Sequence, residues 1–167
     1  MSLIFSGKFI AECYRNGKLI WVDETRNIVT TEGLNRILDV MFHATTQTTT
    51  WYCGLVETDT TATAAMTYDV PVFTESTAYD EATRPAYVEA AASNGSMTNS
   101  ANKAVFTISG TKTMYGAALF SINTKGDHTQ GANNVLYCYA KFGASRPVFD
   151  NDVVNLIYTV TSADDGV

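Results

Sequence analysis

The chain has 167 residues, enough for one domain that buries a hydrophobic core without help from a metal or cross-links. It has 11 Lys and Arg against 17 Asp and Glu, a net charge of −6, and the few basic residues are scattered, so we expect no nucleic-acid partner. Because no segment has the roughly eighteen uncharged apolar residues of a membrane helix, the sequence predicts a soluble protein made in the cytoplasm, without a membrane partner.

The first structural signal is an N-terminal β-hairpin over residues 8–25. Two apolar-rich runs flank Asn16-Gly17, the pair that a two-residue type I′ turn prefers. Such a turn brings aromatic side chains of the two strands within reach of one another. The cross-strand pairs it predicts are Tyr14 with Leu19, Cys13 with Ile20, and Glu12 with Trp21.

A short strand at 27–29 leads into one amphipathic helix, predicted over about residues 31–43. A threonine precedes the helix as its N-cap, and Glu32 lies in the first turn, near the positive end of the helix dipole. Gly33 is tolerable there because it is close to the helix terminus. We expect the apolar face of the helix to lie against a sheet; that face comprises Leu34, Ile37, Leu38, Met41 and Phe42.

Beyond residue 44 the sequence predicts strands and loops. The strands are expected at residues 51–57, 86–92, 103–109, 113–122, 135–142 and 153–161. Long loops at about 58–85 and 123–134 separate some of them, and the first is a polar connection rich in Thr and Ala. Many short strands with a single helix predict a mainly-β fold, an antiparallel β-sandwich or barrel, as one domain over residues 1–167.

The sequence offers little for a metal or cofactor site. Cys13, Cys53 and Cys138 are far apart in apolar, strand-like contexts, which favours buried free thiols. His43 and His128 are not spaced with cysteines or carboxylates as a metal site requires. The acidic clusters at 150–152 and 164–166 lack the spacing of a calcium loop and are predicted as turns. We therefore expect no metal and no cofactor.

The stretch 79-YDEATRPAY-87 places two carboxylates beside an arginine, a combination that acid/base enzymes use. Asp80 and Glu81 are adjacent, however, and neighbours in an extended chain point to opposite sides. We expect Arg84 to pair with Asp80, with Glu81 or with a neighbouring subunit, because its planar guanidinium bridges carboxylates well. A second Arg-Pro pair, Arg146-Pro147, also precedes an apolar segment and is predicted to close a loop.

No recognised catalytic motif occurs, so the sequence predicts no enzyme and no catalytic residue. Seven blocks distributed over nearly the whole chain carry a different signal. They are 12-ECYRNGKLIW-21, 27-NIVTTEGLNRILDVMFH-43, 51-WYCGL-55, 79-YDEATRPAYVEAAA-92, 98-TNSANKAVFTI-108, 115-YGAALF-120 and 153-VVNLIYTV-160. In order and spacing they resemble a family of small virion structural proteins of tailed bacteriophages, whose members include capsid decoration (cement) proteins and tail proteins.

The resemblance implies a jelly-roll-like β-sandwich that forms a homo-oligomer, a dimer or trimer, on the outside of the head and clamps neighbouring major capsid proteins. It places the protein on the capsid surface of a virion, after synthesis in the host cytoplasm. We expect the two Arg-Pro segments to supply contacts within the oligomer or to the capsid. The expected interface residues are Tyr79, Asp80, Glu81, Arg84, Pro85, Tyr87, Arg146 and Pro147.

The resemblance does not decide between head and tail. The alternative is a tail or fibre-associated virion protein that contacts other tail proteins or the host surface through exposed aromatic side chains. Trp21 and Trp51 both lie in predicted strands and are expected to be buried, which disfavours this alternative.

Overall fold

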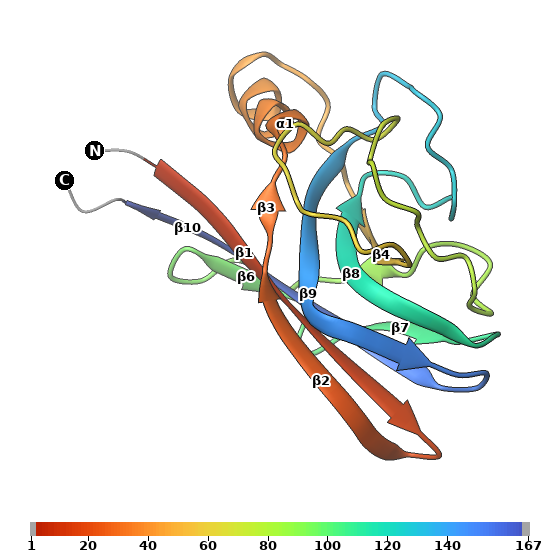
Figure 1. Cartoon of the computed structure of the whole chain (residues 1–167). Helices are drawn as coiled ribbons and strands as arrows, with labels where there is room; N and C mark the ends of the chain where they lie inside the picture. Colours follow the sequence, from red (N-terminus) through yellow and green to blue (C-terminus); the bar gives the residue numbers. More distant parts are fainter. Residues whose placement is uncertain (1–2, 165–167) are drawn as a thin grey trace.

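The predicted hairpin opens the fold in the computed structural model, which describes residues 3–164. Strands β1 (Leu3–Arg15) and β2 (Lys18–Arg26) extend well beyond the turn and form a long arm (Figure 1). Asn16 and Gly17 both have positive φ, 49° and 75°, as a type I′ turn requires. The predicted type I′ turn at Asn16-Gly17 is thus confirmed.

The register of the hairpin confirms one predicted pair and corrects two. Tyr14 pairs with Leu19, but a β-bulge follows, so Cys13 pairs with Trp21 and Glu12 with Val22. The regular register would have put Trp21 opposite Glu12, on the outer face of the sheet. The extra residue instead turns Trp21 inward, where it packs against the hydrophobic core beside the buried Cys13.

Two antiparallel sheets make the sandwich. We call the first the hairpin sheet; its order is β2-β1-β10, and β6 and β7 both pair with the far edge of β10. We call the second the covered sheet; its order is β3-β9-β8-β4-β5. The remaining strands are β3 (Ile28–Val29), β4 (Trp51–Val56), β5 (Ala86–Tyr87), β6 (Ser96–Thr98), β7 (Ala104–Thr107), β8 (Lys112–Phe120), β9 (Leu136–Val148) and β10 (Val153–Asp164).

This arrangement confirms the predicted mainly-β antiparallel sandwich with one short helix. Strands from opposite ends of the chain pair in each sheet, β1 with β10 and β3 with β9. Residues 165 and 166 of the predicted acidic turn at 164–166 lie outside the described residues. Two predicted boundaries were wrong: the strand expected over 86–92 covers only Ala86–Tyr87, and β9 continues to Val148 instead of ending near residue 142.

The main core lies between the inner faces of the two sheets. Alternate residues of β1 and β10 point into it, among them Val154, Leu156 and Tyr158 of the strand predicted over 153–161. Cys13, Cys53 and Cys138 are buried free thiols in this core, as predicted. Burial raises the pKa of Cys53 to about 12, so its thiol stays protonated and unreactive at neutral pH.

Helix α1 (Thr31–Phe42) begins as predicted, with Thr30 as N-cap accepting a hydrogen bond from the Gly33 N–H at 2.9 Å. The face it turns to the sandwich is not the predicted one. Gly33 and Arg36 are buried and Ile37 packs partly on the core, whereas Leu38 is 55 % exposed. The other exposed members of the predicted face are Leu34, Met41 and Phe42.

Close approach of the helix to β9 explains this orientation. A Cβ added at Gly33 would lie 2.5 Å from the backbone oxygen of Tyr137, so only glycine fits against the strand here. Gly33 is therefore required by packing and not merely tolerated near a terminus. Across residues 3–164, none of the helical structure is long and apolar enough to span a bilayer.

Candidate functional site

The outer face of the covered sheet lies beneath the long loop between β4 and β5, residues 57–85. The loop was predicted as a polar connection, yet it carries three buried apolar anchors, Met66, Tyr68 and Phe73. These anchors pack on outward-facing side chains of the sheet and form a second hydrophobic core. The sheet side chains of this second core are Val56, Ala118, Phe120, Leu136 and Tyr139.

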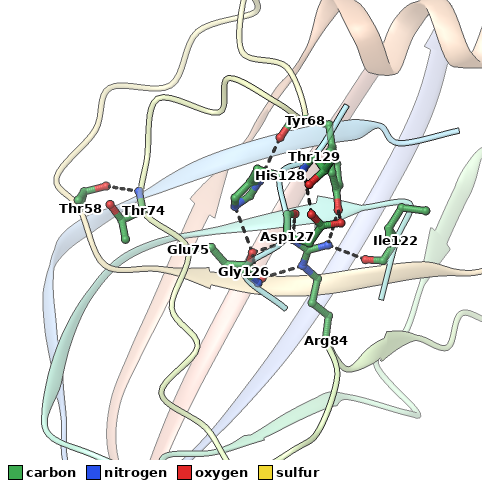
Figure 2. A network of polar contacts seen from close by, with 10 residues as sticks. All are labelled: Thr58, Tyr68, Thr74, Glu75, Arg84, Ile122, Gly126, Asp127, His128 and Thr129. Carbon is green, nitrogen blue, oxygen red and sulfur yellow. Dashed lines mark hydrogen bonds and ion pairs between the residues drawn. The ribbon is translucent and has the colours of Figure 1, made fainter. Parts of the chain in front are cut away.

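Arg84 is the centre of a polar network beneath this loop, and Figure 2 shows it facing Glu75. Its Nε donates to Glu75 Oε1 and one Nη donates to Glu75 Oε2, both at 2.7 Å. The remaining N–H groups donate to the Tyr68 hydroxyl and to the backbone oxygens of Ile122 and Asp127. All five guanidinium donors are therefore satisfied within the chain.

The Arg84 guanidinium also lies over an aromatic ring, with its carbon 4.0 Å from the centroid of Phe120. The Arg84 side chain is fully buried and that of Glu75 is 1 % exposed. A buried ion pair is tolerated only when its charges are fully hydrogen-bonded, because desolvation costs several kcal/mol per ion. The bidentate pair, the carbonyl acceptors and the ring face together meet that requirement.

Glu75 receives further donors from the second long loop, residues 121–135. The Gly126 N–H donates to Glu75 Oε2 at 2.9 Å, and His128 Nε2 lies 3.3 Å from the same oxygen. Burial alone raises the pKa of Glu75, but the bonds from Arg84 and the contact with His128 outweigh it and lower the pKa below its ordinary value. The carboxylate is therefore charged at neutral pH, and both long loops are tied to it.

The Arg84 prediction was right about a fork that binds a carboxylate and wrong about the partner. Asp80 is exposed, and Glu81 instead accepts hydrogen bonds from Thr107 N and Oγ1. Because the Arg84 guanidinium is buried with all its donors used, it does not reach toward a neighbouring subunit in this conformation.

The rest of the YDEATRPAY segment joins the edges of the two sheets. Asp80 N donates to Thr107 O beside β7, while Cys53 N of β4 donates to Pro85 O. Tyr79 and Tyr87 are buried, whereas Asp80 is exposed and Glu81 and Pro85 are partly exposed. An interface role stays a prediction for the three accessible residues.

The second Arg-Pro pair lies inside β9, not in a loop as predicted. Pro147 pairs with Thr113 of β8, and its backbone oxygen accepts from Trp21 Nε1 at 3.0 Å. Arg146 donates from Nε to the buried Asp23 Oδ2 at 2.8 Å. Arg146 is partly exposed and Pro147 exposed, so their interface role also stays a prediction.

A third pair of an arginine with a buried carboxylate lies near the β9–β10 turn. Arg15 Nε and Nη2 donate to the two oxygens of Asp152, each at 2.8 Å. Asp152 also accepts from Phe149 N, so the predicted turn at 150–152 is held by its own carboxylate. The bonds from Arg15 hold the pKa of Asp152 below its ordinary value.

These networks are structural in character. Glu75 and Arg84 are shielded from solvent and fully bonded, so neither has an open position from which to bind a substrate or transfer a proton. The part of the chain that the structure describes contains no group of three His, Cys, Asp or Glu arranged to hold a metal ion. The role of these networks is to hold two long loops against a sheet.

Sequence reasoning missed Glu75 and Asp127 as partners of Arg84, and His128 as a contact of Glu75. Nine residues separate Glu75 from Arg84 and 43 separate Asp127 from it, with no helical or strand periodicity to relate them. The sequence signal that could have been used is that the loop carries large apolar side chains. Tyr68 and Phe73 flank this network, and such side chains are ordinarily buried against another surface.

Helix α1 presents a second feature at the end of the sandwich. Leu34, Leu38, Met41 and Phe42 form an exposed apolar stripe along one flank of the helix, reaching 80 % exposure at Phe42. We call this the α1 stripe. Polar residues, including Asn35 and Asp39, border the stripe on the side where a cavity of about 410 Å³ lies between the helix and the two long loops.

No protein-family model and no curated protein matches this chain.

Proposed function

We propose that the protein is a structural component of a tailed-bacteriophage virion, a cement protein that binds the outside of the head and stabilises contacts between major capsid subunits. The observation that carries the proposal is the α1 stripe, which exposes large apolar side chains on a rigid element. Contiguous exposed apolar side chains are typical of protein interaction sites. The resemblance of seven sequence blocks to small virion proteins supplies the kind of partner.

The loop network supports the same proposal. A clamp that resists forces between capsid subunits needs surfaces that do not deform, and long loops are ordinarily the most mobile parts of a fold. Here the ion pair of Glu75 and Arg84 ties residues 57–85 and 121–135 to the sheet. Several rigid contacts made at once by a symmetric oligomer give strong retention even when each is weak.

The test is binding of purified protein to particles that lack it. Leu38→Glu places a charge in the α1 stripe and should reduce occupancy strongly, because an unpaired charge would be buried in the contact. Val88→Glu is the matched control, since it makes the same change at an exposed apolar side chain outside the α1 stripe. Equal occupancy for wild type and both variants would exclude the α1 stripe as the capsid contact.

Localisation in a cryo-EM reconstruction of the particle decides the placement. Density for the protein on the head lattice supports the cement function, and density only on the tail replaces it with the tail-associated function. Arg84→Ala is unsuitable for this purpose, because Arg84 is buried and its loss would change the fold before it changed an interface.

A further inference from the structure

The outer face of the hairpin sheet differs from that of the covered sheet because most of its side chains are exposed or partly exposed, although Ile157 of β10 is buried. Leu19, Ile20 and Val22 of β2 and Val105 of β7 are between 42 % and 53 % exposed there. Ile10 and Val153 lie between them and are partly exposed. We call this surface the bare face. The exposed apolar side chains are mixed with polar ones, such as Glu12 and Asn155, which lie between Val22 and Val105 in the register.

The charges on the bare face nearly cancel, with one basic side chain in excess, although the chain is acidic. Lys8 pairs with Glu24 at 2.9 Å, and Lys103 pairs with Glu12 at 2.8 Å. Arg26 lies opposite Lys8 in the register and therefore on the same face. Three basic and two acidic side chains thus occupy this face, whereas the whole chain carries a net charge of −6.

This balance bears on the partner. Two copies of a chain with net charge −6 repel one another unless they meet through surfaces that are not acidic. The bare face meets that condition, and its two ion pairs are already neutralised within each copy. A sheet face that combines apolar side chains with charges of both signs can also meet its own copy across a two-fold axis, as an isologous contact requires.

The size of the bare face fits a stable contact. The five strands of the hairpin sheet range from 3 to 13 residues. With a rise of about 3.3 Å per residue and a strand spacing of about 4.8 Å, they cover an area on the order of 650 Å². A standard interface buries roughly 800 Å² on each partner, so this face with its rim is close to sufficient.

We propose that the bare face is a homo-oligomer interface, in which the hairpin sheet of one copy packs face to face on the hairpin sheet of a second copy. The contact is a property of the protein in solution and does not depend on the proposed virion function. The exposed apolar side chains of both copies become buried, and the ion pairs of Lys8 with Glu24 and of Glu12 with Lys103, which lie among them, stay paired within each copy.

The experiment measures association of the purified full chain by sedimentation velocity over a range of concentrations. The double variant Val22→Glu/Val105→Glu should weaken association by roughly a hundredfold or more, because glutamates of the two copies meet across the two-fold. Leu38→Glu, in the α1 stripe, is the matched control and should leave association unchanged. The milder Val22→Thr/Val105→Thr should weaken association less, and circular dichroism checks the fold of each variant.

A second measurement uses the burial of the native cysteines. Because Cys13, Cys53 and Cys138 are buried, Val105→Cys provides one accessible thiol for a spin label. A face-to-face contact should give a defined, short distance between labels in the wild-type background and none when Val22→Glu is added.

Three results would overturn the proposal. The first is a wild-type protein that stays monomeric at every concentration. The second is an oligomer that survives Val22→Glu/Val105→Glu, or that Leu38→Glu disrupts equally. The third is a monomer whose binding to particles is lost in the double variant, which identifies a different protein as the occupant of the bare face. Failure of particle binding with an intact oligomer would count against the proposed function alone.

Discussion

Both outer faces of the sandwich carry large apolar side chains, but only those of the covered sheet lie under a long loop of the chain. On the covered sheet, Tyr68 and Phe73 of the long loop pack on Phe120 and Tyr139, and the ion pair of Glu75 and Arg84 fastens the loop in place. On the hairpin sheet, comparable apolar side chains remain exposed and the ion pairs lie at the surface. The same residue types therefore stabilise the fold on one face and are available for association on the other.

The largest difference should appear when an ion pair is broken on each face. Arg84→Ala should destabilise the protein by about 3–5 kcal/mol, because Glu75 is left charged, buried and without its main partner. Lys8→Ala removes the partner of Glu24 on the bare face and should cost at most about 1 kcal/mol, since both side chains are solvated. Urea unfolding measures both; equal losses would show that the buried pair does not fasten the loop.

Truncation of an apolar side chain should likewise cost more stability on the covered sheet than on the bare face. Phe73→Ala should cost about 3–5 kcal/mol, because it leaves a cavity in the second core. Val105→Ala should cost about 0.5 kcal/mol or less when measured on the monomer at low concentration. A cost for Val105→Ala that rises with protein concentration would be the thermodynamic sign of association through the bare face.

The attachment of α1 should be sensitive to a single methyl group. Gly33→Ala places a Cβ 2.5 Å from the Tyr137 oxygen, so the helix must move away from β9. We expect a loss of about 1–3 kcal/mol despite the higher helix propensity of alanine. Asn35→Ala, on an exposed position of the same helix, should be neutral or slightly stabilising. If both variants are equally stable, the close contact at Gly33 does not hold the helix.

Acid should weaken the covered face through Glu75. Its pKa is lowered in the folded state from an ordinary value of 4.5, so its contribution is fully present above about pH 4.5 and is lost as pH falls through the folded pKa. The free energy of unfolding should therefore decline by up to about 1.4 kcal/mol per pH unit for this group. Urea unfolding between about pH 6 and pH 3 measures the decline. Glu75→Gln should flatten it, and an unchanged slope in that variant would assign the acid sensitivity to other carboxylates.

The fold class could be predicted from the sequence because its signals are local. Asn16-Gly17 specifies a turn whatever surrounds it, the side-chain oxygen of Thr30 caps a helix by accepting from the Gly33 N–H three residues on, and the alternation in 153–161 marks one buried face of a strand. The register of the hairpin could not be predicted, since the bulge before Tyr14 depends on whether Trp21 finds room in the core.

Only part of the site could be predicted from the sequence. YDEATRPAY identified Arg84 as a fork for a carboxylate, because residue type and the neighbouring proline are local properties. Its actual partners, Glu75, Ile122 and Asp127, are brought to it by two loops that only the covered sheet places together.

By itself, the sequence determined a mainly-β chain with one capped helix, a tight hairpin and three buried thiols, since periodicity and turn chemistry act over a few residues. The tertiary structure alone decided which apolar residues are covered. The helix face with Leu38 and Phe42 was expected to be buried and is exposed, while Tyr68 and Phe73, in a loop expected to be polar, are buried. The physical reason is that hydrophobic burial depends on which surfaces come into contact. Gly33 and Arg84 determine two such contacts through partners that are distant in sequence.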